Sequence, residues 1–232
     1  MRRFGFGLVL LTTVFAWACA SAPADLPRPT VTARGSAGEE DVPDIAIRQV
    51  SLKAGETLLV SCNDEGGDAE VYWKDAALHK DVATQGSGFY TAIFSLYSAT
   101  GGTGDVVASH ASAGDLTINA YSVTGLAPSA LDKTSAAKGA GTSPSSGASA
   151  TTGHANEFLW GTIGYATNAR ATGMWNDGFT SGAQFTNTGG ISGVEDGYKT
   201  VSSTGVYTAA KTDVNKDNWA ALIATYATAA GK

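Results

Sequence analysis

Short apolar runs follow one another about every ten residues from residue 45 onward, and Gly, Asn, Asp or Ser separates them. Runs of this length between turn-forming residues are typical of β-strands. The first half of the chain has four of them, at 45–52, 57–62, 70–74 and 89–98. In the last of these, Ile93 and Tyr97 fall on one face, and Phe94 and Leu96 fall on the other. Because both faces are apolar, we expect this strand to lie inside its sheet.

The second half of the chain continues the pattern. The runs at 105–110 and 115–123 are separated by four small residues and predict two strands joined by a turn. Further strands are expected at 157–165, 179–186, 194–201 and 205–212. The Ala-rich segment 218–226 could form a helix, but Trp219, Ala221 and Ile223 alternate along it and favour a strand in an all-β chain.

About ten strands of this kind predict an all-β fold, a two-sheet antiparallel β-sandwich that is jelly-roll-like. We expect one domain over residues 45–228. The stretch 129–153 consists almost entirely of Ala, Ser, Thr, Gly and Lys and could separate two domains. Since no second self-contained core follows it, we expect a long surface connection inside the single domain, with room for an edge strand.

The segment before the first apolar run has a different composition. Residues 21–44 contain several of the six prolines and the acidic cluster Glu39, Glu40 and Asp41. Such a segment is typical of an extended, solvated linker, and we expect the acidic cluster to belong to this linker rather than to bind calcium.

The N-terminus has the composition of a secretion signal. Arg2 and Arg3 supply positive charge, an apolar stretch follows at 8–15, and small residues alternate from Ala16 to Ala20. The apolar stretch is too short to span a bilayer, and this order of segments is that of a signal peptide. We therefore expect residues 1–20 to direct export, either to the extracellular space or to the outer surface or periplasm.

Two cleavage positions fit the small residues around Cys19. Cleavage before Cys19 would leave a thiol that a lipoprotein pathway can acylate, and the protein would then carry a lipid anchor. Cleavage after Ala20 would remove Cys19 with the signal, and the bulky Trp17 favours this alternative. The other cysteine, Cys62, lies in an apolar run, where we expect it to be a buried small hydrophobic residue.

Composition and charge narrow the class of protein. The chain has 29 Gly and 16% charged residues, which matches an all-β exported protein with many turns. A formal net charge of −6 without any basic cluster argues against nucleic-acid binding. No later apolar segment reaches membrane-spanning length.

The segment 71–80, V-Y-W-K-D-A-A-L-H-K, resembles the V-x-W-N-G-x-x-L-x-x strand and turn of a large group of bacterial secreted or phage-associated β-sandwich proteins. The later motifs are similar in order: a long strand, the segment 116–125, a Ser/Thr-rich stretch, an apolar strand with Gly, and a W-x-A-x-x-A-x-Y end at 219–226. The resemblance covers residues 45–228 and departs at Lys74-Asp75, where the group more often has Asn-Gly. It implies an exported β-sandwich that serves as a surface, adhesion or carbohydrate-binding module.

Catalytic chemistry is hard to assemble from this chain. The three histidines lie far apart, and neither a G-x-S-x-G elbow nor an H-E-x-x-H motif is present. Most candidate carboxylates for acid–base work on sugars sit beside Gly or Asn in apparent turns; they are Asp64, Glu65, Asp68, Glu157, Asp177, Glu195 and Asp196. We expect a protein that is not an enzyme, with a hydrolase of extracellular polysaccharide as the least favoured alternative.

One polar loop offers a candidate ligand site. Trp175 lies between glycines beside Asn176 and Asp177. An exposed ring there would stack on a sugar, and its polar neighbours would bind hydroxyl groups. The alternative is a Trp175 that folds back over the end of the sandwich.

A second loop offers oxygen ligands. Asn63, Asp64 and Asp68 fall within six residues and could bind calcium, although their spacing is not that of a known calcium loop. We expect no other cofactor. The patterns together favour a non-catalytic surface binding or adhesion module whose partner is an extracellular glycan or another surface component. The alternative is a structural surface or virion-like assembly subunit.

Overall fold

The fold of this chain is described by a computed structural model, which covers residues 28–65, 67, 69–166, 173–190, 192–212 and 214–229. These residues form fourteen β-strands and no helix, so none of their segments is a membrane-crossing helix. The predicted signal peptide 1–20, including Cys19, lies outside the described residues.

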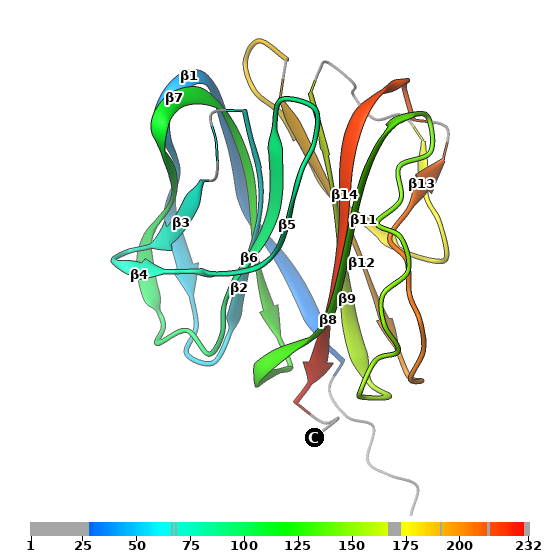
Figure 1. Cartoon of the computed structure of the whole chain (residues 1–232). Helices are drawn as coiled ribbons and strands as arrows, with labels where there is room; N and C mark the ends of the chain where they lie inside the picture. The colour runs from blue at the N-terminus through cyan, green and yellow to red at the C-terminus, as the bar shows by residue number, and fades with distance from the viewer. Residues whose placement is uncertain are drawn as a thin grey trace, which may run out of the picture.

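A seven-stranded sheet contains the first half of the described chain (Figure 1). Its strand order is β4-β3-β7-β2-β6-β5, and β1 pairs with the other edge of β7. All of its ladders are antiparallel. The strands are β1 (Thr30–Leu52), β2 (Thr57–Asp64), β3 (Glu70–Trp73), β4 (Ala76–Ala77), β5 (His79–Gln85), β6 (Tyr90–Leu96) and β7 (Gly102–Thr124).

A five-stranded antiparallel sheet contains most of the second half, in the order β11-β12-β9-β14-β8. Its strands are β8 (Leu126–Gly141), β9 (Glu157–Tyr165), β11 (Thr180–Thr186), β12 (Gly193–Val201) and β14 (Asp217–Thr228). Two further short strands, β10 (Met174–Trp175) and β13 (Lys211–Thr212), pair only with each other.

The long strands β1 and β7 bend together at one end of the molecule. They pair from Thr30 opposite Thr124 to Leu52 opposite Gly102, with register shifts on both sides of Val42. Figure 1 shows both strands arching over at the top. The first half of β7 pairs with β3 and the second half with β2. The seven-stranded sheet is therefore folded into an outer layer, which contains β3 and β4, and an inner layer, which contains β2, β5 and β6.

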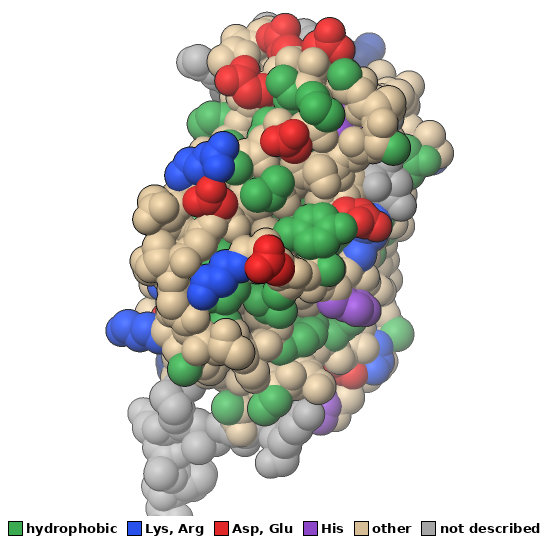
Figure 2. Space-filling view, turned by 90° about the vertical axis from the view of Figure 1, so that its left-hand side faces the viewer, with side chains coloured by type: hydrophobic (Ala, Val, Ile, Leu, Met, Phe, Trp, Pro, Cys, Tyr) green, Lys and Arg blue, Asp and Glu red, His purple; other side chains and the backbone are tan. Residues whose placement is uncertain are grey.

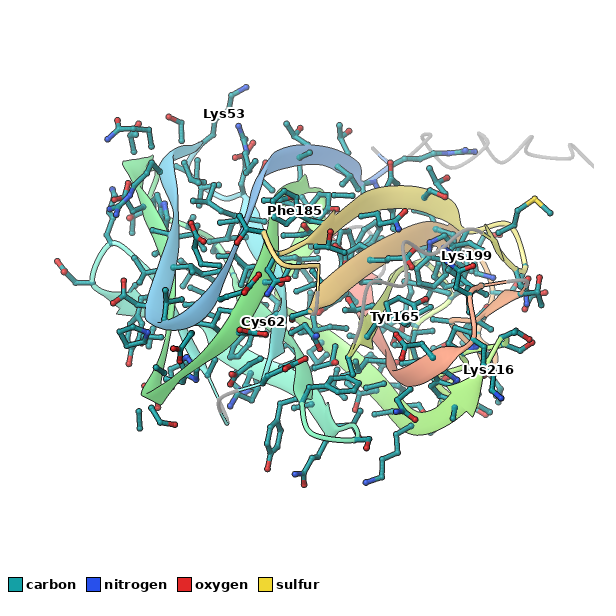
Figure 3. The ribbon with its side chains drawn as sticks, turned by 90° about the horizontal axis from the view of Figure 1, so that it is seen from above. Lys53, Cys62, Tyr165, Phe185, Lys199 and Lys216 are labelled. Carbon is teal, nitrogen blue, oxygen red and sulfur yellow. The ribbon has the colours of Figure 1, made fainter. Side chains whose placement is uncertain are left out.

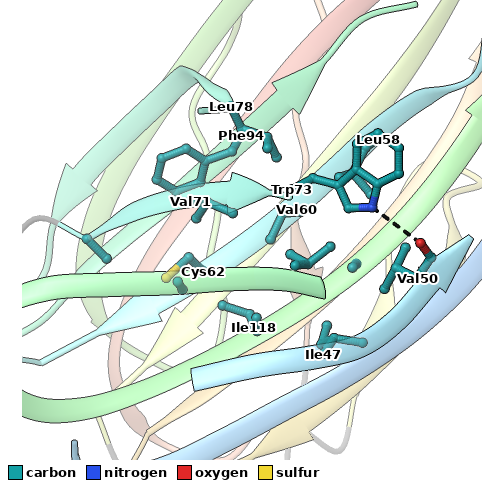
Figure 4. Packing of buried hydrophobic residues seen from close by; sticks show 14 of the residues in the cluster. Ile47, Val50, Leu58, Val60, Cys62, Val71, Trp73, Leu78, Phe94 and Ile118 are labelled. Atoms are coloured by element: carbon teal, nitrogen blue, oxygen red, sulfur yellow. Dashed lines mark hydrogen bonds between the residues drawn. The ribbon is translucent and has the colours of Figure 1, made fainter. Parts of the chain in front are cut away.

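Three hydrophobic cores pack against these layers. The first core lies between the outer and inner layers and contains Trp73 and Cys62, as the packing in Figure 4 shows. The second core lies between the inner layer and the five-stranded sheet and contains Trp160. The third core covers the far face of the five-stranded sheet and contains Trp175 and Tyr165. Seen from above, Cys62 and Tyr165 lie in different parts of the interior (Figure 3).

These layers explain which strands are buried on both faces. In β2, Leu58 and Val60 belong to the first core and Leu59 belongs to the second. In β14, Leu222 belongs to the second core and Ile223 to the third. The predicted all-β antiparallel sandwich is confirmed, as are the interior position of β6, the strand at 218–226 and the burial of Cys62.

The prediction of a linker over residues 21–44 is wrong from Thr30 onward. This segment is the first half of β1 and pairs with β7. Its apolar residues are sparse because it lies at the edge of the sheet, but Val31 packs against the second core and Ala37 and Val42 against the first. A strand with one wet face needs few apolar residues.

The turn predicted between 105–110 and 115–123 is also wrong. Both runs belong to β7, and the small residues between them lie in its bend. The predicted surface connection at 129–153 contains the expected edge strand, because β8 extends to Gly141 at the edge of the five-stranded sheet. The strand predicted at 205–212 is found only at Lys211 and Thr212.

In the segment 142–153, every third residue from Ser146 onward pairs with the segment 205–209. Ser146, Ser149 and Thr152 are buried, and their N–H groups donate to the carbonyl groups of Ala209, Tyr207 and Gly205. The same three side chains accept hydrogen bonds from the N–H groups of those residues. A period of three is that of a polyproline II helix. This regular pairing holds 142–153 against the segment 205–209 above the third core.

Candidate functional site

Trp175 does not offer an exposed ring. Its residue exposure is 9%, and its ring stacks on Phe179 with centroids 5.6 Å apart. The ring closes over Gly197, where any side chain would collide with it, and it also lies against Gly161. The predicted exposed ring at Trp175 is therefore wrong, and the alternative of a Trp folded back over the sandwich is confirmed.

The two polar neighbours of Trp175 are not gathered into a site either. Asn176 accepts a hydrogen bond from the hydroxyl of Thr212 through its Oδ1, at 3.3 Å. Asp177 is exposed in a turn with a φ of 53°, and its carbonyl accepts from Lys199. These contacts fix the turn that leads to β11.

The two predicted calcium ligands that the structure describes, Asn63 and Asp64, do not converge. The Asn63 side chain points between the two sheets, where it donates to Tyr165 and Ser192 and accepts from Thr91. Because neighbouring residues on a strand face opposite sides, Asp64 points the other way. Asp68 lies outside the described residues.

The Asp64 carboxylate is already engaged by donors. It accepts hydrogen bonds from the backbone N–H groups of Gly67 and Ala69, and Nδ1 of His110 lies 3.1 Å from its Oδ1. Donors that point at both oxygens compete with a cation for the same lone pairs. Among the described residues, no three His, Cys, Asp or Glu side chains are grouped to hold a metal ion.

The outer layer exposes one face of its strands. Buried residues such as Ile45, Val71 and Val106 alternate with exposed or half-buried residues along β1, β3 and β7. The buried set packs into the first core, so the other set points outward. We call this surface the Tyr72 face. It consists of Asp44, Ala46, Arg48, Glu70, Tyr72, Ala77, Asp105, Val107 and Ser109.

An apolar row crosses the middle of the Tyr72 face. Ala46 of β1 pairs with Val107 of β7, which pairs with Tyr72 of β3, which pairs with Ala77 of β4. All four residues are half-buried or exposed. Figure 2 shows the side of the molecule on which β3 and β7 lie, with hydrophobic side chains in its middle and charged groups around them.

Polar residues flank the apolar row on both sides. On one side, Asp44 pairs with Ser109, and Ser109 pairs with Glu70. On the other side, Nη1 of Arg48 donates to Oδ2 of Asp105 at 2.6 Å. The N–H group of Gln49 donates to the same carboxylate at 2.9 Å. These hydrogen bonds, first from Gln49 and then from Arg48, lower the pKa of Asp105.

The Tyr72 hydroxyl is oriented by its neighbour on the same strand. It donates a hydrogen bond to Oε2 of Glu70. This bond, together with the negative charge of Glu70, raises the pKa of Tyr72, so the hydroxyl keeps its proton. Glu70 thus fixes the direction of the hydroxyl, and Glu70 itself is an exposed residue.

Several buried acids form hydrogen bonds or ion pairs inside the protein. Asp196 is 1% exposed and accepts hydrogen bonds from Asn119 at 2.8 Å, Thr162 at 2.9 Å and Tyr121 at 3.2 Å. Burial raises the pKa of Asp196 to about 6. These bonds join the inner layer to the five-stranded sheet. Asp196 is therefore a connection between layers and is shielded from solvent.

Two other buried acids have comparable structural partners. The carboxylate of Glu195 forms an ion pair with Lys211, and both side chains are at most 5% exposed. Asp81 has a side chain that is 0% exposed. It accepts hydrogen bonds from Ser95 at 2.8 Å and from Tyr226 at 2.7 Å. These contacts connect neighbouring strands, and Glu195 and Asp81 have separate sets of partners.

Comparison of the chain with protein-family models, curated proteins and solved structures gave no match. The resemblance to secreted or phage-associated β-sandwich proteins therefore stays a prediction. On the Tyr72 face, an aromatic ring, apolar neighbours and flanking charged groups meet.

The sequence contains a signal for this face. In Val71-Tyr72-Trp73, alternation places Tyr72 opposite its two buried neighbours. A Tyr on the polar side of a strand marks a candidate contact residue. The sequence does not show that β1 and β7 extend this face, because Ala46 pairs with Val107, which is about 60 positions away, and Tyr72 pairs with the same residue from about 35 positions away.

Proposed function

We propose that this chain is an exported, non-catalytic binding module and that the Tyr72 face recognises carbohydrate. The observation that carries the proposal is the half-exposed Tyr72 ring in an apolar row on the outer surface of the sheet, with its hydroxyl oriented by Glu70. Sugar rings bind through the same combination, because their apolar faces stack on aromatic rings and their hydroxyl edges need polar partners.

Rigidity supports this role. The inner side of the face is the first core, and the Trp73 ring next to Tyr72 is anchored by a hydrogen bond from its Nε1 to the Val50 carbonyl (Figure 4). A surface that is held in place before binding loses little conformational entropy when a ligand arrives. The flanking pair Arg48 and Asp105 is likewise held by direct contacts.

The binding test compares the wild type with Tyr72→Ala. The processed protein is applied to a glycan array and then to affinity gels that contain the polysaccharides found on the array. The wild type should bind at least one class of glycan, and Tyr72→Ala should weaken binding about tenfold or more, which corresponds to about 1.4 kcal/mol.

Tyr90→Ala is the matched control, because Tyr90 is also a half-buried Tyr on a sheet and lies outside the three cores. It should bind like the wild type. Equal binding by the wild type and Tyr72→Ala would remove the Tyr72 face from the proposal, and a wild type that binds no glycan would refute the function itself.

The export part of the proposal rests on the N-terminal pattern and has its own test. Mass spectrometry of the protein produced in a bacterial host gives the first residue of the processed chain. A start at Ser21 indicates a released protein, and an acylated start at Cys19 indicates a lipid anchor. A chain that still begins at Met1 would contradict export.

A further inference from the structure

The apolar row of the Tyr72 face runs across the strands and not along them. It contains one residue from each of four neighbouring strands: Ala46, Val107, Tyr72 and Ala77. Strands in a sheet are about 4.8 Å apart, so a row across four strands is about 14 Å long. That is about the length of three rings of a linear pyranose chain, with Tyr72 under the second or third ring.

The row is not closed at either end. Ala77 belongs to β4, the edge strand on one side. Ala46 belongs to β1, which pairs with β7 alone, and so its outer edge is the other side of the face. Both end residues carry only a methyl group, and Ala77 is exposed. A chain that lies on the row can therefore continue past both ends.

The polar groups on both sides of the row determine which charge the ligand can carry. Asp44, Ser109 and Glu70 line one side of the row, and Arg48 and Asp105 line the other. Arg48 is neutralised by Asp105, at 2.6 Å, which leaves the exposed acids Asp44 and Glu70 as the excess charge. Carboxylates accept hydrogen bonds from hydroxyl groups and repel other carboxylates.

We propose that the Tyr72 face binds an internal stretch of a linear, uncharged, β-1,4-linked polysaccharide, which lies across β1, β7, β3 and β4. The ribbon shape of such a chain presents flat ring faces to the apolar row and hydroxyl edges to the polar rows on both sides. This inference rests on the proposed function and adds the class of ligand, its direction on the sheet and its independence of chain ends.

The test is isothermal titration of the processed protein with β-1,4-linked gluco-oligosaccharides of increasing length. Affinity should rise up to about three rings, the length that the row of about 14 Å accommodates, and should then level off. A methyl cap on the reducing end of a six-ring chain should leave the affinity unchanged. A β-1,4-linked uronic acid polymer should bind more weakly than the neutral chain.

The length of the contact is tested by a variant at the end of the row. Ala46→Glu places a longer, charged side chain on the path of the ligand. The variant should still bind a two-ring oligosaccharide, but its affinity should no longer increase for longer chains. Ala33→Glu is its control, since Ala33 is an exposed residue of the same strand away from the face.

The outcomes separate this inference from the proposed function. Binding of some glycan that depends on Tyr72 but requires a free chain end, stops growing at two rings or favours uronic acids would overturn the inference and leave the function in place. If the affinity of Ala46→Glu still rises with oligosaccharide length as it does in the wild type, the proposed direction of the ligand across the strands is wrong. Absence of any glycan binding would overturn both.

Discussion

At the scale of single residues, β-bulges decide where several acids point. Asp81 falls between Lys80 and Val82, where the pairing of β5 with β6 shifts its register. Asp132 falls at the corresponding shift in β8, opposite Thr225 and Tyr226. A bulge re-aims the extra side chain. In a regular strand, alternation along the sequence predicts the face on which each side chain lies. The sequence alone does not show where a bulge falls, so the faces of Asp81 and Asp132 could not be predicted from it.

The bulge at Asp132 brings this acid to Glu157, which begins β9. Glu157 is 0% exposed, and its two carboxylate oxygens are buried. Burial is the main cause that raises the pKa of Glu157 to about 7, and the hydrogen bond and charge of Asp132 add to it. The folded protein therefore favours the protonated form of Glu157, in which a carboxyl group is next to a carboxylate.

This raised pKa predicts how stability changes with pH. Between the ordinary pKa of 4.5 and the folded value of about 7, the folded state binds more protons at Glu157 than the unfolded state does. The free energy of unfolding should therefore fall as pH rises through this window, and the loss should be complete above it. Glu65, with a pKa raised to about 7 by burial, and Asp196 act in the same direction.

Glu157→Gln removes one of these titrations and keeps the side-chain shape. Urea unfolding at about pH 5 and about pH 8 should show a smaller fall for Glu157→Gln than for the wild type, with the variant the more stable of the two at pH 8. Asp75→Asn is the control, because Asp75 is exposed. An unchanged pH slope in Glu157→Gln would show that this carboxyl is ionised in the folded protein.

At the scale of elements, strands buried on both faces were the most predictable. The run at 157–165 matches β9, and the runs at 57–62 and 218–226 match β2 and β14 to within two residues at each end. Each of these strands is buried along almost its whole length because it lies between two cores. Dense apolar sequence is the direct consequence of that position.

Elements with few apolar residues were missed for the opposite reason. The first half of β1 has an exposed face, and the pairing at Ser146, Ser149 and Thr152 uses hydroxyl groups instead of apolar side chains. The S-x-x-S-x-x-T spacing is visible in the sequence, but a period of three belongs to neither a strand nor an α-helix. The candidate site was likewise partly visible, as Tyr72, and partly dependent on distant pairing.

The period of three can be tested at its middle residue. Ser149→Ala removes the Oγ that accepts from the N–H group of Tyr207 at 3.0 Å and leaves that donor without its partner. Loss of a partner in a buried place costs about 1–3 kcal/mol, so the free energy of unfolding should fall by that amount. The measurement is urea unfolding followed by circular dichroism.

The control for this variant lies two residues further along the same segment. Thr151 is exposed, and Thr151→Ala should change stability by less than about 0.5 kcal/mol. Equal effects of Ser149→Ala and Thr151→Ala would mean that the hydroxyl groups of this segment bond to solvent, and the regular pairing above the third core would then be incorrect.

At the scale of the whole molecule, the layers share their strands. The inner layer gives one face to the first core and the other to the second, and the five-stranded sheet does the same for the second and third cores. A polar seam also joins the inner layer to this sheet, as in the hydrogen bond between Ser61 and Thr162 at 2.7 Å. No layer can therefore lose its structure without exposing a core of its neighbour.

This sharing predicts that the three cores unfold together. Each core contains its own buried tryptophan, namely Trp73, Trp160 and Trp175. In protein labelled with 5-fluorotryptophan, the three ¹⁹F resonances, assigned through single Trp→Phe variants, should lose their native intensity at the same urea concentration. Coincident transitions of separate probes are the mark of a single cooperative domain.

The third core is the critical case, because its cover contains the segments around 142–153 and 173–179 instead of a full sheet. If the Trp175 resonance is lost at a lower urea concentration than those of Trp73 and Trp160, the cover is a separate unit that opens first. The Tyr72 face would be unaffected, since it lies on the outer layer, on the far side of the first core. Cooperative loss of all three would instead make the support of that face depend on every layer behind it.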